Sequence, residues 1–140
     1  REDNYMTEGI PFTLKYGRDL EITLNLALLK IGVLDKNGSA LTNFSLESFC
    51  QTNDISGNPV VDDKRCSRRW EGGRTDNRGI AQYYLGQGPY MICTTVYANK
   101  NDTRECVYSI NLSPGETKEM RVVTDDIYGG GRITDWWWVE

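Results

Sequence analysis

Hydrophobic and polar residues alternate along much of this chain, and the alternation predicts β-strands. The clearest case follows the turn sequence at residues 76–79, where every second residue is apolar on both sides of a break at residues 86–89. These positions are Ala81, Tyr83 and Leu85 before the break and Tyr90 and Ile92 after it, with Thr94 continuing the period. Because side chains of a strand point alternately to its two faces, each run predicts a half-buried strand. Gly and Pro in the break favour a tight turn, so we expect a β-hairpin.

A second alternating run covers residues 20–33 and changes phase in its middle. The apolar positions keep one phase from Leu20 to Leu28 and a shifted phase from Leu29 to Val33. One extra residue in a period-two pattern turns every later side chain to the other face, so we expect a bulge or a break near Leu28 and Leu29. A helix is the alternative for so leucine-rich a run, but the alternation and the β-branched content favour a strand.

Turn sequences divide the rest of the chain into further predicted strands. Residues 35–38 read Asp-Lys-Asn-Gly, a strong turn signal, and precede a strand with Phe44 and Leu46 on one face. Residues 51–74 are polar and rich in Asn, Asp, Gly and Arg, which indicates a long loop on the surface. The remaining predicted strands are residues 91–97, 105–112 and 118–123, the last of them after a turn at residues 113–116.

Two segments carry a resemblance to a known family. Residues 75–90 follow the pattern Thr-Asp-x-x-Gly-x-Ala-x-Tyr-x-Leu-x-x-Gly-x-Tyr, and residues 33–41 show a strand, an Asp-x-x-Gly turn and a strand. The chain thereby resembles the transthyretin-like or carboxypeptidase-regulatory-like β-sandwich domains, including those of bacterial surface adhesins, over roughly residues 29–50 and 75–124. The resemblance implies an all-β, Greek-key, transthyretin-like or Ig-like sandwich of about seven or eight strands. It implies a fold and no particular activity.

The resembled core leaves an extension at each end. We expect an amino-terminal arm at residues 1–19, a sandwich at 20–124 that includes the long loop excursion at 51–74, and a carboxyl-terminal tail at 125–140. The arm contains a strand-like run at residues 10–14, and the tail contains a triple-glycine hinge at residues 129–131.

Three consecutive tryptophans occupy the tail: Trp136, Trp137 and Trp138. A strand with all three would be apolar on both faces, so something must cover them. One alternative is a neighbouring copy, which would join chains end to end into a filament by strand addition. The other is that each tail folds back onto its own domain.

The four cysteines favour disulfides and an extracellular location. They are Cys50, Cys66, Cys93 and Cys106, and the chain has neither a Cys-x-x-Cys pair nor a histidine, so a zinc site does not fit. A hairpin folding about residues 99–100 places Cys93 opposite Cys106, which leaves Cys50 to pair with Cys66 across the long loop. The alternative is four reduced, buried thiols. Such bridges persist outside the cell. A first residue other than Met fits removal of a signal peptide, although a fragment of a longer chain would begin in the same way.

Four Asn-x-Ser/Thr sequences make this chain a candidate glycoprotein. Their asparagines are Asn37, Asn43, Asn101 and Asn111. The alternatives are matches by chance or an organism that does not glycosylate them.

Composition excludes several classes of function. A net charge of −4 gives no electrostatic reason to bind nucleic acid, and no apolar run approaches the roughly 18 residues of a membrane span. Without histidine there is no Ser-His-Asp or Cys-His arrangement. The acidic pairs at residues 62–63 and 125–126 are more typical of solvated loops than of glycosidase or calcium sites, because neighbours on a strand point to opposite faces. We therefore expect no enzyme, no cofactor and no metal.

Adhesin domains of the resembled type can carry a Lys–Asn cross-link assisted by an acid. The aligned lysine position holds Val33 and the acid position holds Thr94, so we expect no such bond. The expected function is a non-catalytic extracellular structural subunit or cell-surface module, with copies of itself or other surface proteins as partners. The alternative is an adhesive, carbohydrate-binding module that stacks glycans on exposed tryptophans such as Trp70, beside the basic cluster at residues 64–69. A small secreted enzyme is a more distant alternative.

Overall fold

The computed structural model describes residues 2–7, 10–15, 26–62, 64, 73–86, 88–98, 101–125 and 131–140. Within these ranges all regular structure is β, in eleven strands, and none is helical. The predicted all-β class is therefore confirmed.

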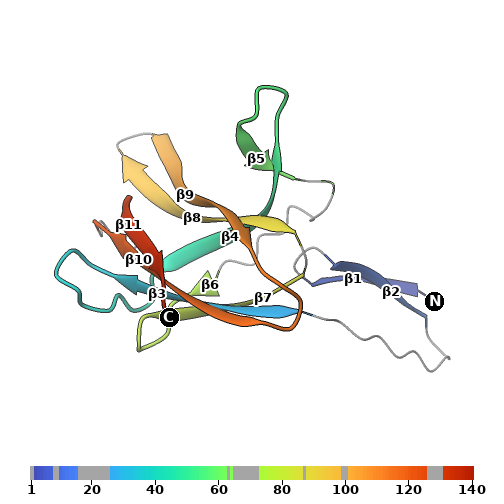
Figure 1. Cartoon of the computed structure of the whole chain (residues 1–140), viewed down its shortest axis with the longest axis horizontal. Helices are drawn as coiled ribbons and strands as arrows, with labels where there is room; N and C mark the ends of the chain where they lie inside the picture. Colours follow the sequence, from blue (N-terminus) through green and yellow to red (C-terminus); the bar gives the residue numbers. More distant parts are fainter. Residues whose placement is uncertain are drawn as a thin grey trace.

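Nine of the strands form two sheets that pack face to face (Figure 1). The four-stranded sheet has the order β11-β10-β3-β7, and the five-stranded sheet has the order β5-β4-β8-β9 with β6 pairing β4. The bounds of the first sheet are β3 Ala27–Leu34, β7 Ile80–Leu85, β10 Thr117–Thr124 and β11 Ile133–Trp138. Those of the second are β4 Ser45–Asn53, β5 Pro59–Val61, β6 Gly73–Arg74, β8 Pro89–Ala98 and β9 Asn101–Asn111.

The core lies between the sheets and is filled by alternate residues of both. The largest fully buried side chains are Tyr90, Phe44, Leu29, Ile31, Leu46, Leu85, Ile92, Ile110 and Met120. Nearly all of them stand at positions where the sequence alternates, so the period-two pattern identified the inner face of each strand.

Strand β3 runs through the centre of the four-stranded sheet, parallel to β10 and antiparallel to β7. Leu29, Ile31 and Val33 are fully buried, as the later phase of the alternation predicted. The pairing with β7 runs without a register shift from Ala27 onward, so the expected break at Leu28 and Leu29 is wrong. The earlier half of that predicted strand, at residues 20–25, lies outside the described residues.

The expected hairpin of β7 and β8 is also wrong, because the two strands belong to different sheets. β7 pairs with β3, whereas β8 pairs with β4 and β9. Leu85 at the end of β7 and Tyr90 at the start of β8 are both fully buried, and they face the core from opposite sheets. The break between them carries the chain across the sandwich.

The second predicted hairpin is confirmed. β8 and β9 are antiparallel neighbours, and Cys93 lies opposite Cys106 in their register. A register shift between Tyr90 and Ile92 marks a bulge, near which Ser109 has a positive φ of 59°. The predicted last strand is β10, with Met120 and Val122 fully buried.

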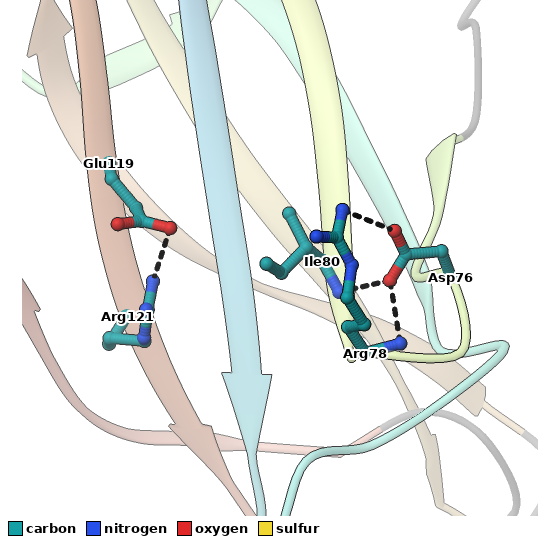
Figure 2. Close-up of polar contacts among 5 residues, drawn as sticks. All are labelled: Asp76, Arg78, Ile80, Glu119 and Arg121. Carbon is teal, nitrogen blue, oxygen red and sulfur yellow. Dashed lines mark hydrogen bonds and ion pairs between the residues drawn. The ribbon is translucent and has the colours of Figure 1, made fainter.

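Three turns share one geometry built on Asp-x-x-Gly. In each, one carboxylate oxygen accepts hydrogen bonds from the amides two and four residues later, and the glycine has a positive φ. The turns begin at Asp35, Asp54 and Asp76, of which sequence reasoning identified the first and the last. Figure 2 shows the Asp76 carboxylate with the amides of Ile80 and Arg78. These bonds, that from Ile80 foremost, lower the pKa of Asp76 below its usual value.

The amino-terminal arm forms a separate hairpin of β1, Glu2–Thr7, and β2, Ile10–Lys15. Among the strands that the structure describes, these two pair only with each other. In Figure 1 the hairpin lies beyond one end of the sandwich, on the side away from β11. Sequence reasoning anticipated β2 but read the polar residues of β1 as unpatterned.

Candidate interaction surface at the edge strand β11

The predicted tail folds back onto its own domain. Within it, β11 pairs antiparallel with β10, which places Trp138 opposite Met120 and Trp136 opposite Val122. Of the two alternatives for the tail, the structure therefore shows the intramolecular one. The tryptophans lie on the outermost strand of the four-stranded sheet, next to β10 (Figure 1).

Trp136 and Trp138 share the inner face of β11, because their partners on β10 are fully buried. Trp138 packs against the core, and its ring meets that of Trp136 edge to face, with centroids 5.9 Å apart. The ammonium of Lys118 lies 4.7 Å from the centre of the Trp138 ring, a cation–π contact. Trp136 is still 37% exposed, so the edge of the sandwich covers this inner row only in part.

Trp137 points to the outer face of the sheet, in one row with Arg121, and is 42% exposed. The Arg121 guanidinium pairs with Glu119 at 3.1 Å, as Figure 2 shows, and its side chain crosses Gly32 on the adjacent strand. A Cβ on that glycine would stand 2.8 Å from the Arg121 Cδ, so the missing side chain makes room for the arginine. Tyr84, on the opposite edge strand β7, is also on this face and is 57% exposed.

The outer edge of β11 has backbone groups that no other described residue pairs with. The amide of Val139 donates to the carbonyl of Glu119 at 2.9 Å. In an antiparallel pair the residues that exchange hydrogen bonds alternate with those that do not, so Trp136 and Trp138 direct their amides and carbonyls away from β10. The Trp136 amide is capped by the carboxylate of Asp135 at 2.8 Å.

A groove of about 300 Å³ separates β11 from β9, the edge strand of the other sheet. Its lining from β9 is Glu105, Cys106 and Val107, and its lining from β11 is Ile133, Thr134, Asp135 and Trp136. Within the described part of the chain, neither Glu105 nor Asp135 has an ion-pair partner. Sequence reasoning missed this groove, because its two walls are about 30 residues apart in the chain and no local pattern joins them.

A set of hydrogen bonds holds the start of β11 in place. The Thr94 hydroxyl, which is fully buried on β8, donates to the carbonyl of Gly131 at 2.6 Å. The amide of Arg132 donates to the Asp125 carboxylate at 2.6 Å, and the Asp125 amide donates to the Arg132 carbonyl at 3.1 Å. A Cβ on Gly131 would stand 2.9 Å from the Asp125 carbonyl oxygen, so this close approach requires glycine. Thr94 thus ties the tail to the five-stranded sheet.

The disulfide between Cys93 and Cys106 is confirmed, and it joins directly opposed residues whose Cα atoms are 4.1 Å apart. Cys50 is also disulfide-bonded. Its predicted partner, Cys66, lies outside the described residues.

The remaining predicted positions are dispersed. Asn37, Asn43 and Asn111 are exposed, while the side chain of Asn101 lies outside the described residues, as does Trp70. Of the basic cluster only Lys64 is described, and it is exposed. Asp63 and Asp126, one member of each acidic pair, are likewise outside. No group of three metal-ligating side chains occurs among the described residues.

None of the described segments is a helix that is long and apolar enough to cross a membrane. The absent Lys–Asn cross-link stays a prediction; Val33 and Thr94, at the motif positions, are both fully buried.

No family model matches the sequence, and no curated protein matches it significantly. Among solved structures, a candidate carbohydrate-binding protein from Pseudomonas aeruginosa is similar at 15% identity and a TM-score of 0.40, over 71% of this chain and 89% of that one. A 9R-lipoxygenase from Cyanothece is similar at 11% identity and a TM-score of 0.44, over 80% of this chain and 18% of the enzyme. A catechol 1,2-dioxygenase from Pseudomonas arvilla is similar at 14% identity and a TM-score of 0.40, over 84% of this chain and 50% of the enzyme. These values assign neither a family nor a ligand nor an activity; the chain has a β-sandwich fold.

Proposed function

We propose that this chain is a non-catalytic structural subunit or surface-protein module of the transthyretin-like, carboxypeptidase-regulatory-like type, which works outside the cell and joins its copies into a filament through its terminal segments. The observation that carries the proposal is strand β11. It forms the edge of a sheet, pairs on its outer side with no other described strand, and exposes 37% of Trp136 and 42% of Trp137. Long apolar edges of this kind are templates for pairing with another chain.

The exposed tryptophan area indicates what kind of contact is needed. At about 250 Å² for a whole side chain, the exposed parts of the two indoles amount to about 200 Å², or about 5 kcal/mol when fully buried. Association itself costs roughly 4–15 kcal/mol. Stacking on the tryptophans alone would therefore give weak association at best. A partner that also pairs with the edge of β11 adds ladder hydrogen bonds and further buried area.

The disulfide supports work outside the cell. Cys93 and Cys106 are bonded across neighbouring strands, and such bridges persist mainly in oxidising compartments. Three asparagines of the glycosylation sequences are exposed, as that modification requires. The complete lack of histidine supports a non-catalytic role, because it removes the usual general base near neutral pH.

Light scattering of the full chain over a range of concentrations tests the proposal. Wild-type protein is expected to form particles larger than a monomer, with elongated shapes in electron micrographs. Deletion of residues 1–18, or replacement of Trp136, Trp137 and Trp138 by Ser, is expected to reduce the particle mass. A wild-type chain that stays monomeric at high concentration would overturn the proposal.

A carbohydrate-binding module is the second candidate. It is favoured by the outer face of the four-stranded sheet, where Trp137 and Tyr84 stand exposed on the two edge strands. Aromatic side chains that offer a face to solvent suit the apolar faces of sugar rings. A glycan array separates the candidates, since binding that is lost in Trp137→Ala, Tyr84→Ala or Trp70→Ala would favour this function. Unchanged binding in all three variants would remove it.

A further inference from the structure

We infer that the edge of β11 together with the groove between β9 and β11 is the acceptor site for strand β2 of a second copy of this chain. The inference rests on the proposed function and names the two surfaces that meet. β2 would lie beside β11 as a fifth strand of the four-stranded sheet and would close the open side of the sandwich.

The acceptor offers backbone groups and a cavity in one place. Trp136 and Trp138 direct their amides and carbonyls outward from β11. The groove of about 300 Å³ lies beside this edge and is lined by Val107, Ile133 and Trp136 among its apolar members. An added strand could therefore form backbone hydrogen bonds with β11 and place every second side chain in the groove. To use the Trp136 amide it must displace the Asp135 carboxylate, which now caps it.

The donor strand has an edge of matching length that pairs with no other described strand. β2 and β11 each have six residues, about 20 Å of strand. Thr7 and Ile10 are the last pair before the turn of the hairpin, and such a pair is of the hydrogen-bonded type. Hydrogen-bonded and non-hydrogen-bonded pairs alternate along an antiparallel ladder. The backbone N–H and C=O positions of Pro11, Thr13 and Lys15 therefore point away from β1. Pro11 has no N–H. The ladder donors of β2 are therefore Thr13 and Lys15.

Charge selects β2 over β1. Glu105 and Asp135 bring two carboxylates to the groove, and within the described residues neither has an ion-pair partner. The sequence of β2 contains one charged residue, Lys15, whereas β1 contains Glu2 and Asp3. Like charges beside each other disfavour β1 at this groove, and opposite charges favour β2.

The placement of the two surfaces makes the contact intermolecular. In Figure 1 the β1–β2 hairpin lies beyond one end of the sandwich, and β11 lies on the other side. Each copy would then offer a donor at one end and an acceptor at the other. Such a heterologous contact need not close on itself, and repeated it gives a filament.

The test uses variants of the full chain and light scattering of the assembled mass. Thr13→Pro removes a ladder donor at a position that faces away from β1, and we expect it to weaken assembly about tenfold or more, while Thr13→Val leaves assembly unchanged. Trp136→Ser is expected to weaken assembly by a similar factor. Its matched control is Tyr108→Ser, because Tyr108 is 46% exposed and does not line the groove.

Charge reversal adds a second measurement that misfolding cannot imitate. Lys15→Glu and Glu105→Lys are each expected to weaken assembly, and the double variant is expected to recover it. If wild type assembles but Thr13→Pro, Trp136→Ser and the charge reversals all leave assembly unchanged, the acceptor lies elsewhere and only this inference fails. If wild type does not assemble at all, the proposed function fails with it.

Discussion

The hydroxyl of Thr94 is expected to hold the tail against the sandwich, and Thr94→Val tests this directly. Valine keeps the shape of the side chain and removes its hydrogen bond to the Gly131 carbonyl, which is 2.6 Å long and buried. A buried carbonyl left without its donor costs about 1–3 kcal/mol. For a chain of this size, a loss of about 2 kcal/mol lowers the melting temperature by about 5–8 °C.

The neighbouring residue provides the control. Thr95 also has a hydroxyl in a hydrogen bond, to the Glu47 carboxylate at 3.3 Å, but the bond is only partly buried and does not involve the tail. Thr95→Val is expected to cost less than about 1 kcal/mol, because water can replace the lost partner.

Hydrogen exchange then shows where the stability is lost. Gly131 stands just before β11, so Thr94→Val is expected to raise exchange at the amides that bond β11 to β10, such as Val139, more than exchange within β3. Equal melting temperatures for the Thr94 and Thr95 variants, or unchanged exchange in β11, would refute the view that Thr94 fixes the tail.

Three further predictions follow from single contacts. Replacing Cys93 and Cys106 by Ala removes the disulfide between residues 13 positions apart and is expected to lower the free energy of unfolding by about 3 kcal/mol in urea titrations. A loss under about 1 kcal/mol would contradict this. Because the folded-state pKa of Asp76 is below its usual 3.8, its stabilisation is present above that pH and lost as pH falls through the folded-state pKa. Asp76→Asn should remove this part of the acid dependence of the urea midpoint. Gly73→Ala places a Cβ in steric conflict with the Tyr83 hydroxyl and should cost about 1–3 kcal/mol, which thermal unfolding measures.

The sequence predicts strands well where one face of the strand is buried and the other is not. The alternation at Leu29, Ile31 and Val33, and again at Met120 and Val122, reports the inner faces of two neighbouring strands. The Cys93–Cys106 disulfide could be predicted for a related reason, because the position of the turn residues sets the register of the hairpin.

Which strands pair with each other is harder to predict from the sequence. The turn between β7 and β8 has the Gly and Pro of a hairpin, yet the same residues suit a chain that crosses from one sheet to the other. Both arrangements bury Leu85 and Tyr90, so the hydrophobic pattern cannot separate them. The groove is harder still to predict from the sequence. Glu105 and Asp135 line it together only because of the order in which the strands are arranged in the two sheets.

Edge strands need protection against pairing with other chains, and two edges of this sandwich have it. β5 is only three residues long and begins with Pro59, which lacks an amide hydrogen. β9 has a register shift and a positive φ at Ser109, and a bulge of this kind disturbs a flat edge. β7 has no such device in its sequence, since its six residues include no proline, glycine or charge.

β11 also has little protection, and it is the edge that carries three consecutive tryptophans. It has six residues, no proline and no glycine, and its one charged residue is Asp135. That carboxylate caps the amide of Trp136 but leaves the outward groups of Trp138 to solvent. A sequence selected only for a soluble monomer would be expected to place charge or proline here, as it does at β5. The three tryptophans at this one edge are therefore best explained by a partner strand that covers them.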